Sequence, residues 1–300
     1  MLDKLEFLLA LAREKHFRRA AERCGVAQPT LSLGIRSLEE KLGVPLVKRS
    51  SRFQGFTPEG ERVLVWARRL VGDAHAMQQE IDALKGDGGA HIRLAALPSA
   101  MPIVSLLTAP FHDRHPETRF TVLARPSDAV VRLLHHRDID AGITYTDGGP
   151  IDGVTTTPLF REDYLLLTTS NGPLGKARRL TWAQAARLPL CMLTRDFQQR
   201  RIIDEVMGKL GLDLVAPLET DSEIAIAAHV RTGRWSSIVR RSVADLLDGS
   251  GELRAIPLIE PSISRTIGLI VSKRFITPPA VAALIEEARQ LRPPQPLAAE

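Results

Sequence analysis

Residues 17–42 read FRRAAERCGVAQPTLSLGIRSLEEKL, and this stretch predicts two short helices joined by a tight turn. Ala20 and Ala21 are small enough to let a second helix cross close above them. Gly25 can adopt the left-handed backbone conformation that ends a helix, and Pro29 suits the first turn of the next helix. Four apolar residues recur at helical spacing and predict the buried face of that helix: Leu31, Ile35, Leu38 and Leu42.

The opposite face of the second helix is small, polar and partly basic. It carries Pro29, Ser32, Leu33, Arg36 and Glu40. A helix with these two faces can lie in a DNA major groove while its apolar side holds it to a neighbour. The alternative is an ordinary helical hairpin in a protein core, because helix pairs are common units of protein folds.

The sequence around the helix pair favours DNA binding. Residues 49–57 form a short basic segment that would make a hairpin wing beside the second helix. Residues 1–62 contain 12 Lys and Arg against 8 Asp and Glu, a net charge of +4 out of +5 for the whole chain. Clustered positive charge is typical of surfaces that contact DNA phosphates.

The order of residues in this region carries a family resemblance. It rests on Phe17, Ala20, Ala21, Gln28, Pro29, Leu31, Ser32, Ile35, Leu38, Glu39, Leu42, Gly43, Leu46, Arg49, Thr57 and Gly60. Over about sixty residues the pattern resembles the winged helix-turn-helix of the LysR-type transcriptional regulators. Leu33 and Gly34 depart from it, because the family usually has polar residues there, and Gly34 costs roughly 1 kcal/mol of helix propensity against Ala.

The helix faces and the resemblance together predict the DNA contacts. We expect a groove-facing row made of Gln28, Pro29, Thr30, Ser32 and Leu33. We expect Arg36 and Arg52 to contact bases or backbone, and Lys48 and Arg49 to meet phosphates. Leu33 can touch a thymine methyl group where a polar contact is lost.

A long helix follows the wing. Thr57 is a suitable N-cap and Pro58 a suitable first residue, so the helix begins there and ends at the glycines of residues 86–89. Its apolar residues recur as a heptad seam: Val63, Ala67, Leu70, Ala74, Met77, Ile81 and Leu84. We expect the seam to pair two chains into a homodimer. Its two helix-turn-helix domains would then bind two DNA half-sites that are about 10 bp, or a multiple of 10 bp, apart. The alternative is a helix that lies on its own domain.

After residue 90 the pattern changes to strands alternating with helices, which predicts a parallel sheet covered by helices. Expected strands are 91–97, 119–124, 140–145, 163–169, 190–193, 214–218, 236–239, 254–257 and 265–272. Expected helices are 102–115, 127–136, a short one from 181, 197–210, 222–232 and 278–291. Alternation alone allows any doubly wound fold. The resemblance implies a two-lobed, periplasmic-binding-protein-like effector domain.

The expected organisation has three parts. Residues 1–57 form the winged helix-turn-helix domain, residues 58–90 the linker helix and hinge, and residues 91–300 the effector-binding domain. Within the last part, lobe I comprises 91–162 and 266–300, and lobe II comprises 163–265. The fold class is therefore multidomain, with a mainly α head and an α/β two-lobed regulatory domain.

Ligands of open α/β sheets bind beyond the carboxyl ends of the strands, near helix N-termini. Candidate effector-binding residues at such ends are Ser99, Ala100, Thr146, Thr194, Arg195 and Ser237, and the resemblance places Ser99 and Thr194 at positions that commonly contact the inducer. Taken singly, each Ser or Thr is better explained as a helix cap or loop residue, and a solvated surface arginine is the alternative for Arg195. Arg195 would select a carboxylate, so we expect a small organic anion as effector.

Composition excludes several other classes. Cys24 and Cys191 fall in different expected domains and form no disulfide framework, which indicates a reducing compartment. No run of eighteen apolar residues and no secretion signal is evident, so we expect a cytoplasmic protein with no membrane contact. No metal-ligand pattern, phosphate loop or nucleophile elbow is present, so we expect no catalytic residues, no metal and no cofactor other than the effector.

The prediction from sequence is a LysR-type, DNA-binding transcriptional regulator that responds to a small molecule bound between two lobes. Its expected partners are double-stranded operator DNA and further copies of itself, as a homodimer or homotetramer, with RNA polymerase as a further candidate. The alternative function is a solute-binding module, or an enzyme, on the same two-lobed fold.

Overall fold

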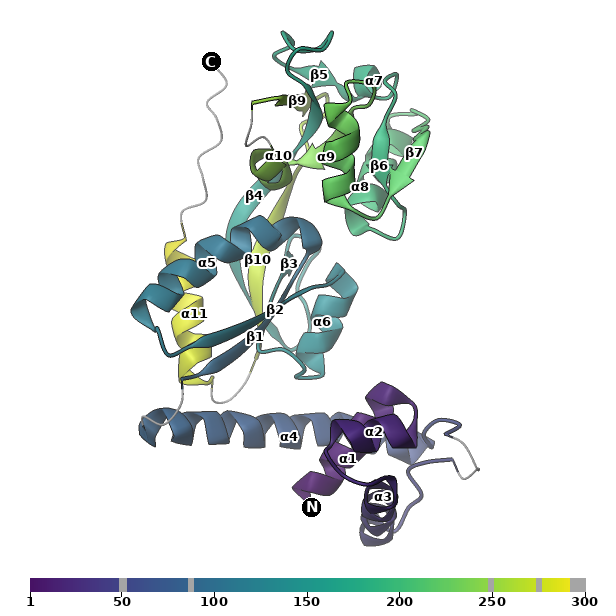
Figure 1. Ribbon diagram of the computed structural model, residues 1–300, viewed down its shortest axis with the longest axis vertical. Coiled ribbons are helices and arrows are strands. Elements are labelled where there is room, and N and C mark those ends of the chain that lie inside the picture. The colour runs from purple at the N-terminus through teal and green to yellow at the C-terminus, as the bar shows by residue number, and fades with distance from the viewer. Residues whose placement is uncertain (49–52, 86–88, 248–250, 274–276, 292–300) are drawn as a thin grey trace. The chain divides into compact units, whose positions relative to one another are not determined.

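The computed structural model describes residues 1–48, 53–85, 89–247, 251–273 and 277–291, without the side chains of residues 79, 80 and 82–85. The chain divides into two compact units (Figure 1). The first unit comprises residues 1–90 with 135–138, and the second comprises residues 91–134 with 139–300. In the described part of the chain, no helix is both long and apolar enough to cross a bilayer.

The first unit begins with three helices, α1 (Leu2–Glu14), α2 (Phe17–Arg23) and α3 (Gln28–Leu42). Their common core contains Leu8 and Leu11 from α1, Ala20 and Ala21 from α2, and Leu31 from α3. Ala20 and Ala21 are almost completely buried, as expected for small residues beneath a crossing helix. The predicted helix pair is therefore confirmed.

The turn between α2 and α3 has the expected chemistry. Gly25 has a φ of +67°, the left-handed conformation that glycine adopts without strain. The Val26 N–H donates to the Ala21 carbonyl at 3.0 Å, which satisfies the open end of α2. Pro29 lies in the first turn of α3. The prediction is wrong for Leu42, which is exposed at the end of α3 because Gly43 turns the chain there.

Gly34 has a packing role that helix propensity does not reveal. It lies in α3 opposite Phe7 of α1, and a Cβ atom at position 34 would lie 2.6 Å from the Phe7 ring. Real Cβ atoms do not approach carbon that closely. The glycine that weakens α3 as an isolated helix therefore permits close contact between α3 and α1.

A wing follows α3. Val47 and Phe56 form an antiparallel bridge, and the Lys48 N–H donates to the Gly55 carbonyl at 3.1 Å. The Glu39 carboxylate accepts the N–H groups of Leu46 and Val47 at 2.7 and 3.0 Å, which fastens the wing to α3. The wing tip, with Arg49 and Arg52, lies outside the described residues.

Helix α4 (Pro58–Lys85) begins where expected. The Thr57 hydroxyl accepts the Gly60 N–H at 2.9 Å and donates to the Pro45 carbonyl at 2.6 Å, so the N-cap also ties the helix to the wing. Near its start, α4 buries Leu64, Ala67 and Val71 in the core of its own unit. Among the described side chains of the same helix, the large apolar ones that are exposed are Val65, Trp66, Leu70, Met77 and Ile81.

The second unit is built on a mixed sheet with two lobes. Lobe I contains β1 (His91–Ala96), β2 (Arg119–Ala124), β3 (Ala141–Tyr145), β10 (Ser264–Ser272) and the first part of β4 (Val154–Thr169). The strand order is β2-β1-β3-β10-β4, with β1 parallel to both β2 and β3 and with β10 antiparallel to β3 and β4. The elements that accompany these strands are η1 (Pro98–Ala100), α5 (Met101–Arg114), α6 (Ser127–His135) and α11 (Pro279–Gln290).

The second half of β4 belongs to lobe II. Residues 154–163 of β4 pair with β10, whereas residues 164–169 pair with β8 (Ser237–Arg240) or β9 (Leu253–Ile259). Figure 1 shows β4 and β10 running between the lobes. The remaining elements of lobe II are β5 (Leu180–Thr181), α7 (Trp182–Ala185), β6 (Cys191–Leu193), α8 (Gln198–Lys209), β7 (Leu218–Thr220), α9 (Glu223–Arg231) and α10 (Arg241–Leu247).

The structure corrects two expected strands and adds a helix. Strand β4 begins at Val154 rather than at residue 163, because its first half is needed to pair with β10. Strand β7 covers 218–220 rather than 214–218, since residues 218–220 align with β6. Helix α10 was not expected, and it directly follows β8. The two-lobed α/β class itself is confirmed.

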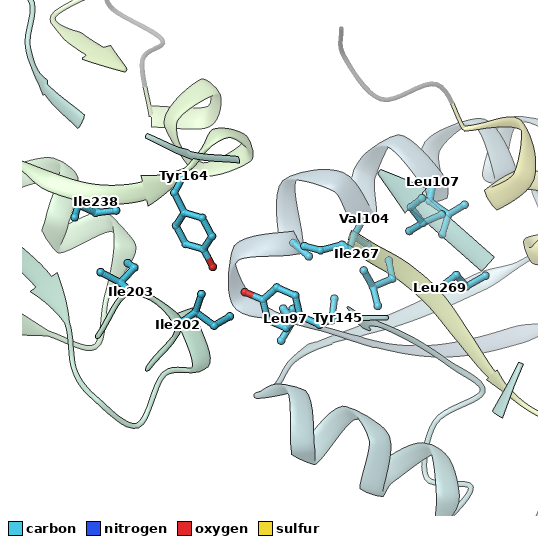
Figure 2. Packing of buried hydrophobic residues seen from close by; sticks show 14 of the residues in the cluster. Leu97, Val104, Leu107, Tyr145, Tyr164, Ile202, Ile203, Ile238, Ile267 and Leu269 are labelled. Carbon is cyan, nitrogen blue, oxygen red and sulfur yellow. The ribbon is translucent and has the colours of Figure 1, made fainter. Parts of the chain in front are cut away.

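One apolar core passes from lobe I into lobe II. It includes Leu97, Tyr145 and Ile267 of lobe I together with Tyr164 and Ile202 of the lobe II side, which lie close to one another in Figure 2. A second core, beneath α9 and α10, contains Leu165, Leu167 and Val239. The lobes therefore meet through packed side chains, and polar groups at this junction are shielded from water.

Candidate functional site

The outer face of α3 presents a row of polar side chains. Gln28, Ser32 and Arg36 are four residues apart, and all three line a groove of about 1050 Å³ between α3 and the base of the wing. Lys48 lines the same groove from the wing, and Phe17 from α2. The spacing brings the three α3 side chains onto one face because an α-helix repeats every 3.6 residues.

The other predicted groove residues are also accessible. Pro29, Thr30 and Arg36 are exposed, Ser32 is half-buried, and Leu33 keeps 63% of its surface in contact with solvent. Leu33 lies on the outer side of α3 and adds an apolar contact to an otherwise polar face. The structure therefore brings Gln28, Ser32, Arg36 and Lys48 to one groove, while Pro29, Thr30 and Leu33 are exposed on α3 outside its lining.

The basic groups of this surface are available for a ligand. The Arg36 guanidinium makes no hydrogen bond or ion pair with any part of the chain that the structure describes. By contrast, the neighbouring Glu39 carboxylate is occupied by the backbone N–H groups of the wing. An exposed guanidinium on a groove wall has the chemistry to bind phosphate or the edge of guanine.

The seam residues of α4 separate into two groups. Ala67 is fully buried in its own unit and Val63 packs against the same core, so neither is open to a second chain. Leu70, Met77 and Ile81 are 45%, 58% and 38% exposed, and Ala74 is half-buried. Trp66, at 60% exposure, extends the outer stripe at a spacing of four residues from Leu70. The side chain of Leu84 lies outside the described set.

At the lobe junction, Ser99 and Ala100 are buried in η1, directly before α5. The Ser99 hydroxyl has no hydrogen-bond partner among the described residues, while its carbonyl accepts the Ser242 hydroxyl of α10 at 3.1 Å. Because η1 belongs to lobe I and α10 to lobe II, this hydrogen bond joins the two lobes. Ser99 therefore lies where the lobes touch.

The remaining predicted effector residues lie elsewhere. The Ser237 hydroxyl is buried without a partner, but Ser237 alternates with Ile238 and so shares the strand face of Val239, beneath α9. Thr146 is half-buried and pairs through its N–H with the Thr266 carbonyl at 3.0 Å. Its side chain packs against Gly268.

Thr194 and Arg195 follow β6 in lobe II. The Thr194 N–H donates to the Thr220 carbonyl at 3.0 Å and continues the β6–β7 pairing. The Arg195 side chain is 73% exposed and faces Asp204 of α8, with 3.6 Å between Nε and a carboxylate oxygen. The structure therefore gives Arg195 a carboxylate neighbour within its own lobe, and does not bring it to Ser99.

The lobe junction contains a buried ion pair that the sequence analysis did not single out. Arg240 Nη1 donates to Glu162 Oε2 at 3.2 Å, and both side chains are almost fully buried. Glu162 lies on β4 just before the strand enters lobe II, and Arg240 ends β8. The other Glu162 oxygen contacts the Ser242 hydroxyl and accepts its N–H at 3.3 Å.

Two tyrosines frame this pair. Tyr145 ends β3, Tyr164 lies on β4, and their hydroxyl groups point toward each other in Figure 2. Both hydroxyls are buried and interact with each other, although neither meets the full geometry of a hydrogen bond within the described chain. The Arg240 guanidinium carbon lies 5.5 Å from the centre of the Tyr145 ring, a cation–π distance. Arg265 lies over the same ring at 5.4 Å and pairs with Asp147.

Burial shifts the acid–base equilibria of this cluster. Loss of water raises the pKa of Glu162, while Arg240 and the hydrogen bonds from Ser242 oppose that rise. Burial also raises the pKa of Tyr145 and Tyr164, so both remain neutral phenols at physiological pH. Glu223, at the start of α9, also has a raised pKa because of burial, opposed by Arg240.

Unpartnered polar atoms are concentrated in the second unit. At the junction they are Ser99 Oγ, Tyr145 OH, Tyr164 OH and Arg240 Nε; others are Gln198 Oε1, Gln199 Oε1, Ser237 Oγ, Arg241 Nε and Arg265 Nε, the last of which lies 3.0 Å from Asp147. Folded proteins leave few buried polar atoms without a partner, and such atoms often mark a site for water, an ion or a ligand. In the sequence, the one signal that could have identified Arg240 as a site residue was its position at the end of a strand.

The described residues hold no cluster of three or more His, Cys, Asp or Glu side chains arranged to bind a metal ion. Both cysteines are free thiols, and Cys191 is buried. Burial raises the pKa of the Cys191 thiol to about 11. This leaves the thiol protonated and weakly nucleophilic at neutral pH.

Two family models match the chain. Residues 2–61 match the bacterial regulatory helix-turn-helix protein of the lysR family, and residues 85–292 match the LysR substrate binding domain. A hydrogen peroxide-inducible genes activator from Haemophilus influenzae is 30% identical over 282 residues, covering 89% of this chain and 88% of the relative. A probable nitrogen assimilation transcriptional activator from Synechococcus elongatus is 26% identical and covers 93% of this chain and 91% of the relative.

Solved structures agree in fold over nearly the whole chain. A full-length OxyR variant from Pseudomonas aeruginosa superposes with a TM-score of 0.75 at 25% identity, covering 97% of this chain and 95% of that one. Full-length CbnR in complex with its target DNA superposes with a TM-score of 0.66 at 21% identity, covering 97% and 100%. At this identity, the comparison with CbnR shows a shared fold only. The bound DNA belongs to the structure of CbnR.

Proposed function

Since the chain belongs to the LysR family of transcriptional regulators, we propose that it binds operator DNA through α3 and the wing, and responds to a small molecule at its lobe junction. The observation that carries the DNA-binding part is the row of Gln28, Ser32 and Arg36, which lines a groove together with Lys48. Polar and basic side chains on the outer face of a recognition helix can reach base edges and phosphates.

The proposed contacts follow the faces of the head. Gln28, Pro29, Thr30, Ser32 and Leu33 face the major groove. Arg36 and Arg52 read bases or backbone, and Lys48 and Arg49 bind phosphates. Each phosphate contact adds to the salt dependence of binding, by a slope of about 0.9 in log affinity against log salt concentration.

We propose that α4 joins two copies of the chain through the stripe Trp66, Leu70, Met77 and Ile81, with Ala74 at its edge. This stripe is shifted from the seam drawn by periodicity alone, because Ala67 and Val63 are used by their own unit. A homodimer presents two heads to an operator with two half-sites, and pairs of dimers extend this to a homotetramer.

We propose the division into residues 1–57, 58–90 and 91–300 as reading head, linker and effector domain, with lobe II spanning 163–265. The support is that β4 changes partners after residue 163, from β10 to β8 and β9. A ligand at such a junction changes the relative stability of lobe arrangements only through its differential affinity for them. RNA polymerase is a candidate partner of the DNA-bound protein.

For the effector, the support is the set of buried, unpartnered polar groups around Ser99 at the lobe junction. We keep the hypothesis of a small organic anion, with Arg195 and Thr194 as the contacts that the sequence favours. No enzymatic role is needed to account for these groups, since hydrogen-bonding side chains without a nucleophile–base pair are typical of a binding site.

The decisive experiment measures binding of the full-length protein to a duplex from the region upstream of its own gene, by fluorescence anisotropy at several salt concentrations. Arg36→Ala is compared with Arg13→Ala, a matched exposed arginine of α1. We expect the first variant to lose affinity and part of the salt slope, and the second to behave as the parent protein. Equal binding to this duplex and to random DNA, at all salt concentrations, would refute the proposal.

A further inference from the structure

The lobe junction has a specific imbalance between donors and acceptors. Ser99 Oγ, Tyr145 OH, Tyr164 OH and Arg240 Nε are buried without a hydrogen bond of full geometry, and each carries a hydrogen that it can donate. The two phenols face each other, and a hydrogen bond between them uses one of these four hydrogens and leaves three. Arginine cannot accept a hydrogen bond, so Arg240 Nε is satisfied only by an acceptor. A partner that satisfies this cluster therefore has to bring acceptor atoms, and an anionic acceptor makes the stronger hydrogen bonds.

These groups belong to one connected cluster. Tyr164 and Arg240 are directly opposite each other on β4 and β8. The guanidinium carbon of Arg240 lies 5.5 Å from the centre of the Tyr145 ring. Nη1 of the same guanidinium lies 3.2 Å from the Glu162 carboxylate. Glu162 is linked through Ser242 to the backbone of Ser99. Residues of both lobes thus converge on the guanidinium.

We propose that Arg240 is the residue that selects the charge of the effector, by binding a carboxylate of the ligand in competition with Glu162, while Tyr145 and Tyr164 donate hydrogen bonds to the same ligand. This inference rests on the proposed effector site and moves its anionic contact from Arg195, which is exposed beside Asp204, to a buried arginine. The ligand class is a small carboxylate.

Competition with Glu162 follows from charge. Arg240 faces two carboxylates, Glu162 at 3.2 Å and Glu223 at the start of α9. Glu162 in turn interacts with Ser242, with both phenols and with the Glu223 carboxylate. Arg265 lies opposite Glu162 on β10 but is paired with Asp147. A ligand anion near Arg240 is therefore repelled by ionised Glu162, and is accepted when Glu162 is displaced or takes up a proton.

Variants of Glu162 and Arg240 make the competition between Glu162 and the ligand measurable. Glu162→Gln keeps the shape of the side chain and removes the competing charge, so it should tighten carboxylate binding at least tenfold. Arg240→Gln should abolish binding. Arg234→Gln, a matched exposed arginine in the same lobe, should bind as the parent protein does. Affinity of the parent protein should fall as pH rises through the raised pKa of Glu162, and this dependence should be weaker in Glu162→Gln, where Glu223 is the remaining carboxylate that faces Arg240.

The experiment uses calorimetry and thermal unfolding of the full-length protein with sodium formate, benzoate and succinate. Sodium chloride and sodium phosphate at equal ionic strength, acetamide and ethylammonium chloride provide the comparison. Carboxylate binding that is lost in Arg240→Gln and retained in Arg234→Gln supports the proposal. If Glu162→Gln does not fold, the pH dependence of carboxylate binding to the parent protein tests the competition instead.

Several outcomes would overturn the proposal. They are the absence of carboxylate binding to both the parent protein and Glu162→Gln, an undiminished affinity in Arg240→Gln, and a preference for phosphate. Binding of acetamide or ethylammonium that is lost in Tyr145→Phe would preserve the effector site of the proposed function and remove the carboxylate assignment. The two failures are therefore distinguishable.

Discussion

Arg240 of β8 donates to Glu162 of β4 at 3.2 Å, and the two residues lie where β4 passes from lobe I to lobe II. Removing one member of a buried ion pair lowers the free energy of unfolding by about 3–5 kcal/mol, because the other charge stays buried without a partner. The pair therefore has a structural role at the junction of the lobes as well as the recognition role proposed above.

The first prediction concerns the pH dependence of folding. Burial raises the pKa of Glu162 above its ordinary value of 4.5, so the folded state holds this proton more tightly than the unfolded state. The contribution of Glu162 to stability should therefore be largest below pH 4.5 and decline as pH rises to the raised folded value. Urea unfolding of the parent protein and of Glu162→Gln across this range measures the difference. A difference in stability that grows with pH in favour of the parent protein would contradict the prediction.

The second prediction concerns Gly34. Replacement by Ala improves helix propensity by about 1 kcal/mol, but the new methyl group would collide with Phe7, and overpacking costs about 1–3 kcal/mol. Gly34→Ala should therefore lower the melting temperature. Adding Phe7→Leu should recover most of the loss, because it makes room for the methyl group. The single Phe7→Leu variant is the control, and a stabilised Gly34→Ala protein would show that the two helices are not in close contact.

The third prediction concerns self-association. Leu70→Glu combined with Ile81→Glu places two charges on the exposed stripe of α4, and should give monomers by light scattering together with weaker operator binding. Val65→Glu is the matched control, because Val65 is 48% exposed but lies outside the stripe. A double variant that keeps the size of the parent protein would exclude the stripe as the interface.

The fourth prediction concerns the thiols. Some relatives are named as hydrogen peroxide-inducible activators, but burial raises the pKa of Cys191 to about 11 and that of Cys24 in the same direction. Thiolate is the reactive form, so both cysteines should react slowly with iodoacetamide at pH 7 and faster as pH rises. Mass spectrometry of the labelled native protein, with the urea-unfolded protein as control, measures the rates. Rapid modification of the native protein at pH 7 would be inconsistent with these environments.

The sequence was sufficient where a structure depends on neighbours along the chain. The spacing of Leu31, Ile35 and Leu38 defined the buried side of α3, and Gly25 defined the turn before it. The Thr57 cap likewise marked the start of α4. These features rely on helical periodicity and on local backbone preferences, which are properties of short segments.

Only the tertiary structure decided which apolar residues of α4 remain exposed, why position 34 is a glycine, and which charged groups meet at the lobe junction. Ala67 fits the heptad pattern as well as Leu70 does, yet it is buried in its own unit. Glu162 and Arg240 are 78 residues apart in the chain. Periodicity contains no information on contacts at such separations, because they arise from the packing of whole elements against one another.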